Sequence, residues 1–146
     1  MIPINFEVGN NYRKIVNPTK SSDGSVNQHG WTCFVKLEKD YIKYSAYIIK
    51  SINFKFDLKK ETYQKQIKSR GLKENKLAYE MHFAGPLIDS IDVSLEFQRR
   101  TGVGSILIIK YDVDFTNVGN TRTFTFYLRK DDFDRIKFAY EMYGAT

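Results

Sequence analysis

Ile91-Asp92-Val93-Ser94-Leu95-Glu96-Phe97 is the stretch that decides the fold, because apolar and polar side chains alternate strictly along it. Successive side chains of a β-strand point to opposite faces of its sheet, so this alternation predicts a strand with one buried and one exposed face. The same period of two recurs in six further segments, and the sequence therefore predicts seven strands. The other six are Ile4–Val8, Trp31–Leu37, Ile52–Phe56, Tyr79–Phe83, Leu107–Phe115 and Phe124–Leu128.

Turn-forming residues separate these segments, notably NPTKSSDGSVNQHG at 17–30, RRTGVG at 99–104 and TNVGN at 116–120. Short strands joined by such turns are typical of two antiparallel sheets packed face to face. We therefore expect an all-β fold, an immunoglobulin-like antiparallel β-sandwich over residues 1–130. Its strands 91–97 and 107–115 should be antiparallel neighbours across the 99–104 turn.

The C-terminal residues 131–146 follow a different pattern, because their apolar side chains recur at helical spacing. We expect a short amphipathic helix over 132–143, with Asp131 or Asp132 as its N-cap. The spacing is set by Phe133, Ile136, Lys137 and Tyr140. The segment 59–76 has two interpretations, a second helix or a long loop, since Gln64 to Gln66 favour a helix whereas Ser69 and Gly71 interrupt one.

Length and composition indicate one domain, 1–146, because the 146 residues are 42% hydrophobic and show no linker. The single cysteine, Cys33, excludes an internal disulfide and a multi-thiolate metal site, so we expect a reducing compartment. No apolar run approaches the ~20 residues that cross a bilayer. The N-terminus also lacks the pattern of a signal peptide, and we expect a soluble intracellular protein without a membrane partner.

Positive charge is concentrated in one segment of a chain that carries +6 overall. Residues 59–76 hold seven basic side chains against only Glu61 and Glu74; the basic ones are Lys59, Lys60, Lys65, Lys68, Arg70, Lys73 and Lys76. Such a segment is either a solvated surface or a contact for phosphate groups. Because the chain has no RNP-type motif and no zinc finger, a contact with DNA would be nonspecific.

Residues for catalysis or metal binding are not indicated. The two histidines, His29 and His82, lack the spacing to other ligands that a metal site or a nucleophile–base pair requires. Alternation places His82 on a solvent-facing side and Cys33 on a buried one. Residues 101–104 lack the Gly-Lys-Ser/Thr ending of a phosphate loop and fit a turn between strands. We therefore expect no enzymatic activity, no cofactor and no metal.

Five motifs, in order along nearly the whole chain, resemble those of one known family of domains. Residues 29–35, HGWTCFV, resemble the His-x-Trp-Thr-x-Phe-Val strand, and 47–54, YIIKSINF, are similar to Tyr-Phe-Ile-Lys-Lys-Val-x-Phe. EVGN at 7–10 resembles the opening Gly-Asn strand end, while AYEM at 78–81 with Gly85 resembles Pro-Phe-Glu-Val and the Gly-Trp-Gly loop that precedes the next strand. Together these motifs resemble the YEATS domains, immunoglobulin-like sandwiches that read acylated lysines on histone tails. The resemblance implies a non-enzymatic nuclear chromatin module with a histone tail, that of H3, as its partner.

In YEATS domains the acyl-lysine enters a slot between aromatic rings, and its carbonyl is held by a Ser/Thr hydroxyl and a loop N–H. Thr62 and Tyr63 resemble the family's Ser/Thr-Phe pair if a few extra residues follow Phe56; without them, Asp57, Lys59 and Lys60 fall at the family positions. Pro86 replaces the loop aromatic and has no N–H, so the resemblance implies a weakened pocket. The implied binding set is Asn27, His29, Thr62, Tyr63, Gly85, Pro86, Leu87 and Asp112.

A second function fits the same residues. In this alternative the slot is closed, and the domain is a scaffold that docks a chromatin-complex subunit or nucleic acid through its basic segment 59–76. An open slot beside Thr62 and Tyr63 would favour the reading of acyl-lysine, and a filled one would favour the scaffold.

Overall fold

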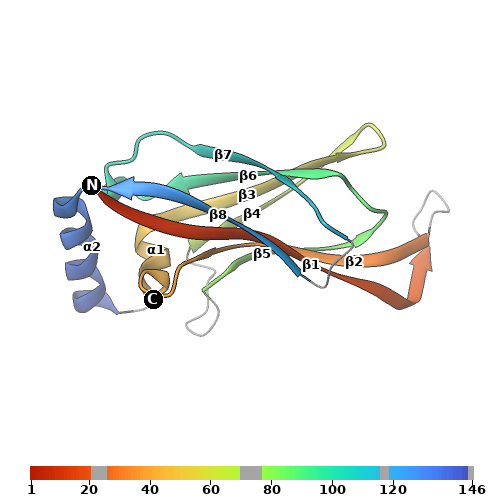
Figure 1. Cartoon of the computed structure of the whole chain (residues 1–146), viewed down its shortest axis with the longest axis horizontal. Coiled ribbons are helices and arrows are strands. Elements are labelled where there is room, and N and C mark those ends of the chain that lie inside the picture. The colour runs from red at the N-terminus through yellow and green to blue at the C-terminus, as the bar shows by residue number, and fades with distance from the viewer. Residues whose placement is uncertain (21–25, 70–76, 116–118, 145–146) are drawn as a thin grey trace.

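Two four-stranded antiparallel sheets form the body of the computed structural model, which describes residues 1–20, 26–69, 77–115 and 119–144 (Figure 1). One, the β1 sheet, has the strand order β5-β2-β1-β8, and the other, the β3 sheet, has the order β4-β3-β6-β7. The strands are β1 (Ile2–Lys20), β2 (Val26–Leu37), β3 (Ile49–Leu58), β4 (Glu61–Lys68), β5 (Tyr79–Gly85), β6 (Ser90–Phe97), β7 (Leu107–Asp112) and β8 (Gly119–Leu128). The helices are η1 (Ile42–Tyr44), α1 (Ser45–Ile48), η3 (Arg99–Thr101) and α2 (Lys130–Tyr143).

Strand β6 confirms the expectation from alternation, because Ile91, Val93, Leu95 and Phe97 are all buried. It pairs with β3 on one side and antiparallel with β7 on the other, as expected, although β7 ends at Asp112 rather than at Phe115. Each central strand contributes one apolar face to a common core between the sheets. The prediction of an immunoglobulin-like β-sandwich with a short C-terminal helix is therefore confirmed.

The segment 61–68 corrects the sequence interpretation, because it is neither a helix nor a loop but strand β4, an eighth strand among the described residues. It pairs with β3 from Leu58↔Glu61 to Ser51↔Lys68. Only Tyr63 and Ile67 are apolar in this edge strand, so its alternation is too weak to indicate a strand. Residues 61–68 form a strand because their backbone pairs with β3, although their side chains alone do not indicate one.

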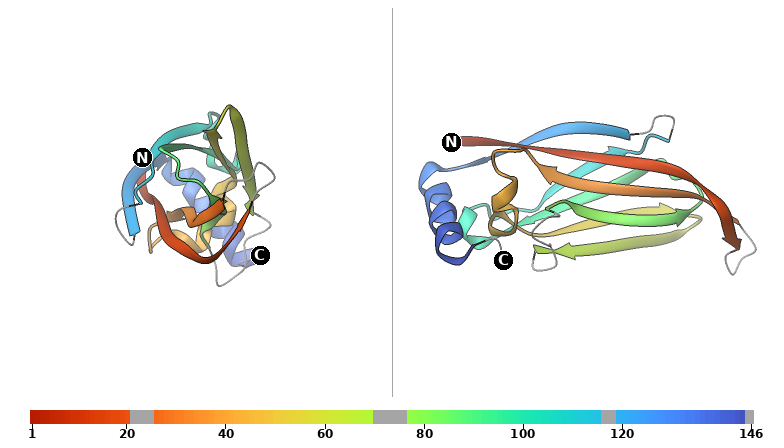
Figure 2. Two further views of the ribbon diagram at one scale, coloured as in Figure 1. Left: turned by 90° about the vertical axis from the view of Figure 1, so that its right-hand side faces the viewer. Right: turned by 90° about the horizontal axis from the view of Figure 1, so that it is seen from below.

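The β1–β2 hairpin corrects a second expectation. Residues 17–20 and 26–30 were predicted to belong to a turn, but they continue the two strands, with Thr19 opposite Asn27 and Lys20 opposite Val26. The register shifts between Lys14 and Thr19, which marks a bulge or irregularity in the ladder. The hairpin extends beyond the sandwich at the end opposite α2 (Figure 2).

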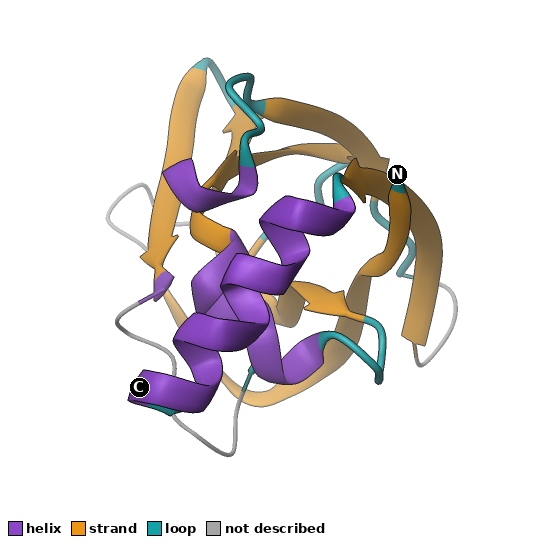
Figure 3. Ribbon diagram, turned by 90° about the vertical axis from the view of Figure 1, so that its left-hand side faces the viewer, coloured by secondary structure: helices purple, strands orange, loops and turns teal. Residues whose placement is uncertain are grey.

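Helix α2 lies across the other end of the sandwich, next to α1 (Figure 3). Phe133 and Tyr140 contact Tyr44 edge-on, with ring centroids at 5.5 and 5.1 Å. The expected N-cap is wrong, because the helix begins after Arg129 and has no capping side chain. Asp132 lies instead in the first turn, buried, and accepts a 3.0 Å bond from Nε of Arg129. A carboxylate there is favoured by the helix dipole.

Substitution of Trp31 tests how far the core depends on one ring. Its side chain is only 3% exposed and contacts Phe56 and Phe83 at 5.4 and 5.2 Å. Trp31→Ala should lower the free energy of unfolding by about 3–5 kcal/mol, measured by urea denaturation. Trp31→Phe should cost only about 1 kcal/mol, because Nε1 has no hydrogen-bond partner among the described residues. A loss below about 1 kcal/mol for the alanine variant would contradict a core role.

The β3–β4 turn offers a stabilising substitution. Lys59 and Lys60 have φ values of 50° and 67°, a left-handed conformation that costs a non-glycine residue about 1 kcal/mol. Replacing the pair by Asn-Gly, which two-residue hairpins prefer, should raise the melting temperature by about 2–4 °C. The Ala-Ala variant removes the same charges without relieving the backbone and should show no gain; an equal gain would assign the effect to charge.

Candidate functional site

Aromatic side chains gather at the end of the sandwich opposite α2, where they bridge the two sheets. Ring contacts at 5.0–6.4 Å link them in a continuous chain, called the aromatic cluster below. Its members are Tyr12, His29, Trp31, Phe56, Tyr63, Phe83 and Phe115. Trp31 and Phe56 are buried, whereas Tyr63 and Phe83 are half-buried and reach the surface between the edge strands β4 and β5.

Thr62 and Tyr63 lie on opposite faces of the β3 sheet, because neighbouring residues of a strand alternate. The Tyr63 ring stacks on Phe56, on the core side. The Thr62 hydroxyl is exposed and donates a 2.7 Å hydrogen bond to Oδ1 of Asp57, its cross-strand partner. A hydroxyl and a ring so placed do not line one slot together.

The core side of Tyr63 is filled by other rings. Phe56 lies parallel to it at 5.2 Å with an interplanar angle of 14°, and Phe83 approaches at 5.8 Å and 64°. Phe56 and Phe83 also contact each other at 5.0 Å. Tyr63, which the sequence assigned to a slot, therefore packs with Phe56 and Phe83 as a closed cluster.

The register of β2 and β5 brings His29 and Gly85 opposite each other, so these two predicted site residues do meet. Nδ1 of His29 shares a 2.5 Å hydrogen bond with the Tyr12 hydroxyl, which orients the imidazole toward β1. Pro86 and Leu87 follow β5, half-buried and exposed respectively. Because Pro86 has no N–H, this loop position offers a ligand no backbone donor.

Two predicted site residues lie elsewhere or outside the description. Asn27 belongs to β2, opposite Thr19, and its side chain is not among those described. Asp112 is the last residue of β7, exposed and opposite Ser90. Strands β3 and β6 separate β7 from β4, so Asp112 does not join Tyr63.

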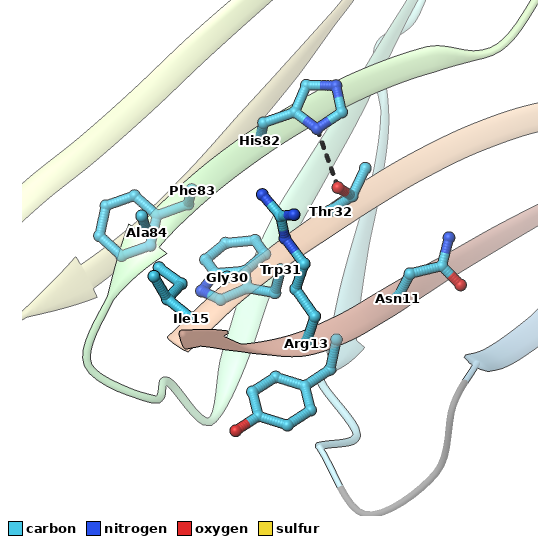
Figure 4. A pocket seen from close by; sticks show the side chains of 10 residues that line it. Asn11, Arg13, Ile15, Gly30, Trp31, Thr32, His82, Phe83 and Ala84 are labelled. Atoms are coloured by element: carbon cyan, nitrogen blue, oxygen red, sulfur yellow. Dashed lines mark hydrogen bonds between the residues drawn. The ribbon is translucent and has the colours of Figure 1, made fainter. Parts of the chain in front are cut away.

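A pocket of about 330 Å³ on the outer face of the β1 sheet was not foreseen (Figure 4). Gly30, which lies between Arg13 and Ala84 in neighbouring strands, creates the hollow. A Cβ at Gly30 would meet Nε of Arg13 at 3.2 Å, so the arginine side chain lies over the glycine. His82 stands at the rim, exposed as predicted, with Nδ1 bonded to the Thr32 hydroxyl at 2.9 Å. The sequence placed Gly30 in a turn and did not show which strands flank it.

The predicted basic segment is partly described. Lys59, Lys60, Lys65 and Lys68 all lie exposed on the β3–β4 hairpin. Arg70, Lys73 and Lys76 lie outside the described residues. The four described lysines therefore share one hairpin, at the edge of the sandwich that also carries Tyr63.

The buried thiol has no catalytic character. Burial raises the pKa of Cys33 to about 12, so the thiol is protonated at neutral pH and is a poor nucleophile. Within the described ranges, no three His, Cys, Asp or Glu side chains come together as a metal site would need. In the same part of the chain, none of the helices has the length and hydrophobicity to span a membrane.

Known proteins resemble this chain in structure but not in sequence. No family model and no curated protein sequence matches this chain. Among solved structures, that of the Yaf9 YEATS domain is similar with a TM-score of 0.67 and 17% identity over 94% of each chain. A crystal structure of the yeast AF-9 homolog Yaf9 gives a TM-score of 0.66 and 16% identity over 94% of this chain and 87% of the other. The chain has the YEATS-domain fold.

The YEATS-like motif Gly9-Asn10 has a structural explanation in this chain. A Cβ at Gly9 would lie 2.5 Å from the Asn120 carbonyl oxygen and 2.8 Å from Cζ of Phe34, so only glycine fits. Buried Asn10 accepts hydrogen bonds from the Tyr111 hydroxyl at 2.8 Å and from the Asp114 N–H at 3.2 Å. These bonds tie β1 to β7 and to the segment that follows it. The motif thus connects the two sheets of the YEATS-like fold.

Proposed function

We propose that this chain is a non-enzymatic chromatin module of the nucleus that binds a histone tail, with the H3 tail as its first candidate. The supporting observation is the YEATS-domain fold over 94% of the chain. Among the similar structures, one is the Yaf9 YEATS domain bound to H3K27ac, with a TM-score of 0.66 and 17% identity over 94% of each chain. Another is described as recognizing an H3K122suc peptide.

The surface beside Tyr63 is the proposed place for the tail. The Tyr63 and Phe83 rings are half-buried there and offer apolar surface to a peptide. The Glu61 carboxylate, on the same face of β4, accepts a bond from the Tyr63 hydroxyl at 2.9 Å. This carboxylate is exposed and suits the lysine and arginine side chains of a histone tail.

Acylation contributes little to this proposed contact. The slot of acyl-lysine readers needs facing rings and donors to the acyl carbonyl, whereas here the Tyr63 ring is stacked on Phe56. Thr62 faces away from that ring, and Pro86 lacks an N–H. The tail should therefore be held by its charges and by the outer edge of the aromatic cluster.

Titration of acetylated, crotonylated and unmodified H3 tail peptides tests the proposal by isothermal calorimetry. We expect all three to bind within about threefold of one another, because the acyl group finds no slot. Tyr63→Ala should weaken binding about tenfold through lost ring contact. Thr62→Ala is the matched control and should change the affinity less than twofold.

Two outcomes would contradict the proposal. Absence of binding to every histone peptide would remove the tail as partner. Tight binding that depends on the acyl group and ignores Tyr63→Ala would show that a different, open pocket reads the modification.

The filled aromatic cluster favours a second candidate, a scaffold that docks another chromatin-complex subunit and contacts DNA nonspecifically. The four exposed lysines of the β3–β4 hairpin support the DNA contact. Binding that passes through such lysines releases counterions and weakens steeply with salt.

Charge reversal on the hairpin tests this contact. The double variant Lys65→Glu with Lys68→Glu should make the dependence on salt shallower. The negative slope of log affinity for duplex DNA against log salt should decrease in magnitude by about two, measured by fluorescence anisotropy. The matched control reverses the exposed Lys36 and Lys39, outside the hairpin, and should keep the slope. Equal loss in both variants would indicate that only the net charge matters, and an unchanged slope in both would make the hairpin an ordinary solvated surface.

A further inference from the structure

Strand β7 is an open edge of the β3 sheet. It pairs antiparallel with β6, and no other described strand pairs with it (Figure 1). Its ladder with β6 runs from Leu95↔Leu107 to Ser90↔Asp112 without a register shift, and β7 contains no proline. Bulges, prolines and covering segments are the usual protection of an edge strand against pairing with another chain. Among the described residues, β7 has none of these, and its only charged side chains are Lys110 and Asp112.

One hydrogen bond shows which backbone groups of β7 face the open edge. The Val113 N–H donates to the Asp89 carbonyl at 3.0 Å, so the pair Asp89/Val113 is of the hydrogen-bonded type. Antiparallel ladders alternate this type with the non-bonded type, and the odd residues of β7 therefore turn their groups toward β6. The N–H and C=O groups of Ile108, Lys110 and Asp112 point away from β6, toward the open edge.

Large apolar side chains accompany this open edge. Ile106 and Ile108, just before and within β7, are 57% and 67% exposed. They form one wall of a hollow of about 580 Å³ on the outer face of the β3 sheet, beside Asn53, Gln66, Ser94 and Glu96. A partner strand beside β7 would place its own side chains against both isoleucines, on the side away from this hollow. Two exposed isoleucines thus lie along an edge where three backbone positions have no pairing strand in the described part of the chain.

We propose that β7 binds an extended segment of a partner protein, which adds to the β3 sheet as an antiparallel strand. The outward side chains of the edge are Ile106, Ile108, Lys110 and Asp112, and cross-strand neighbours interact as pairs. Read from its N-terminus, the partner segment therefore has the form basic-x-acidic-x-apolar-x-apolar. The basic residue faces Asp112, the acidic one faces Lys110, and the apolar pair covers the isoleucines. This surface is separate from the one proposed for the histone tail.

A peptide of this form tests the proposal. The probe is acetyl-TKTETVTVT-amide, and its matched control is acetyl-TETKTVTVT-amide, which has the same composition with the two charges exchanged. Binding is followed by NMR of the ¹⁵N-labelled chain. We expect the probe to shift the amide signals of Ile108 and Lys110, to slow their hydrogen exchange, and to bind about fivefold more tightly than the control.

Variants separate the edge from other apolar surfaces. Ile108→Lys should abolish binding of the probe, because it places a charge beside the incoming strand. The control Tyr127→Lys changes an exposed residue, 55% exposed on edge strand β8 of the other sheet, and should leave binding unchanged. If Ile108→Lys does not fold, Ile108→Thr replaces it in the test. This variant keeps the β-branched shape and should weaken binding of the probe about threefold. Lys110→Glu should weaken binding of the probe and strengthen binding of acetyl-TKTKTVTVT-amide, which places a lysine opposite the new glutamate.

Three results would overturn the proposal. The first is no change at Ile108 and Lys110 with either peptide, and the second is equal affinity of the probe and its charge-exchanged control. The third is a dimer in analytical ultracentrifugation that becomes a monomer with Ile108→Lys, which would assign the edge to a second copy of this chain. None of these results bears on the H3 titration, because Tyr63 lies on the opposite edge strand, β4.

Discussion

Packing of the Trp31 ring between the two sheets is the interaction on which the functional end of the domain depends. The ring projects from β2 of the β1 sheet and contacts Phe56 of the β3 sheet edge-on at 5.4 Å. Phe83 and Phe115 contact the same indole at 5.2 and 6.4 Å. An indole has a large apolar surface, and its burial here fixes the distance between the sheets at the end opposite α2. Tyr63 is linked to Trp31 through Phe56 and Phe83, and Tyr12 is linked to it through Phe115.

The β3–β4 turn exerts a second constraint, on register. Two residues, Lys59 and Lys60, join the strands, so Leu58 must face Glu61 and Phe56 must face Tyr63. A shift by one residue would exchange the two faces of β4 and place Thr62 toward the core. The two turn lysines adopt a left-handed conformation, and the register that this short turn sets stacks Tyr63 on Phe56. This register is also what separates the Thr62 hydroxyl from the aromatic cluster.

The two open edges of the β3 sheet differ in chemistry, which suits different partners. Edge strand β4 carries exposed lysines together with the half-buried Tyr63, and it faces β5 across the sandwich. Edge strand β7 carries exposed isoleucines followed by Lys110 and Asp112. Because β3 and β6 lie between them, a ligand on one edge leaves the other accessible. A β-sandwich can thereby hold two partners at once without a change of its core.

The sequence by itself determined which side chains of the strongly periodic segments are buried and which are exposed. The strict alternation of β6, the buried place of Cys33, the exposed place of His82 and the helical spacing of α2 all follow from local periodicity, and the structure agrees with each. The YEATS-like motifs also indicated the fold correctly, because Gly9 and Asn10 serve it through short-range sterics and buried hydrogen bonds.

Only the tertiary structure decided the properties that depend on a partner strand. Strand β4 exists because β3 pairs with it, the face of Thr62 depends on that register, and the hollow at Gly30 depends on Arg13 and Ala84 as neighbours. The open edge of β7 likewise depends on strand order rather than on the residues of β7. Local sequence specifies whether side chains repeat with the period of a strand or of a helix. Which strands pair depends on contacts between residues far apart in the sequence, and this pairing brings functional side chains together.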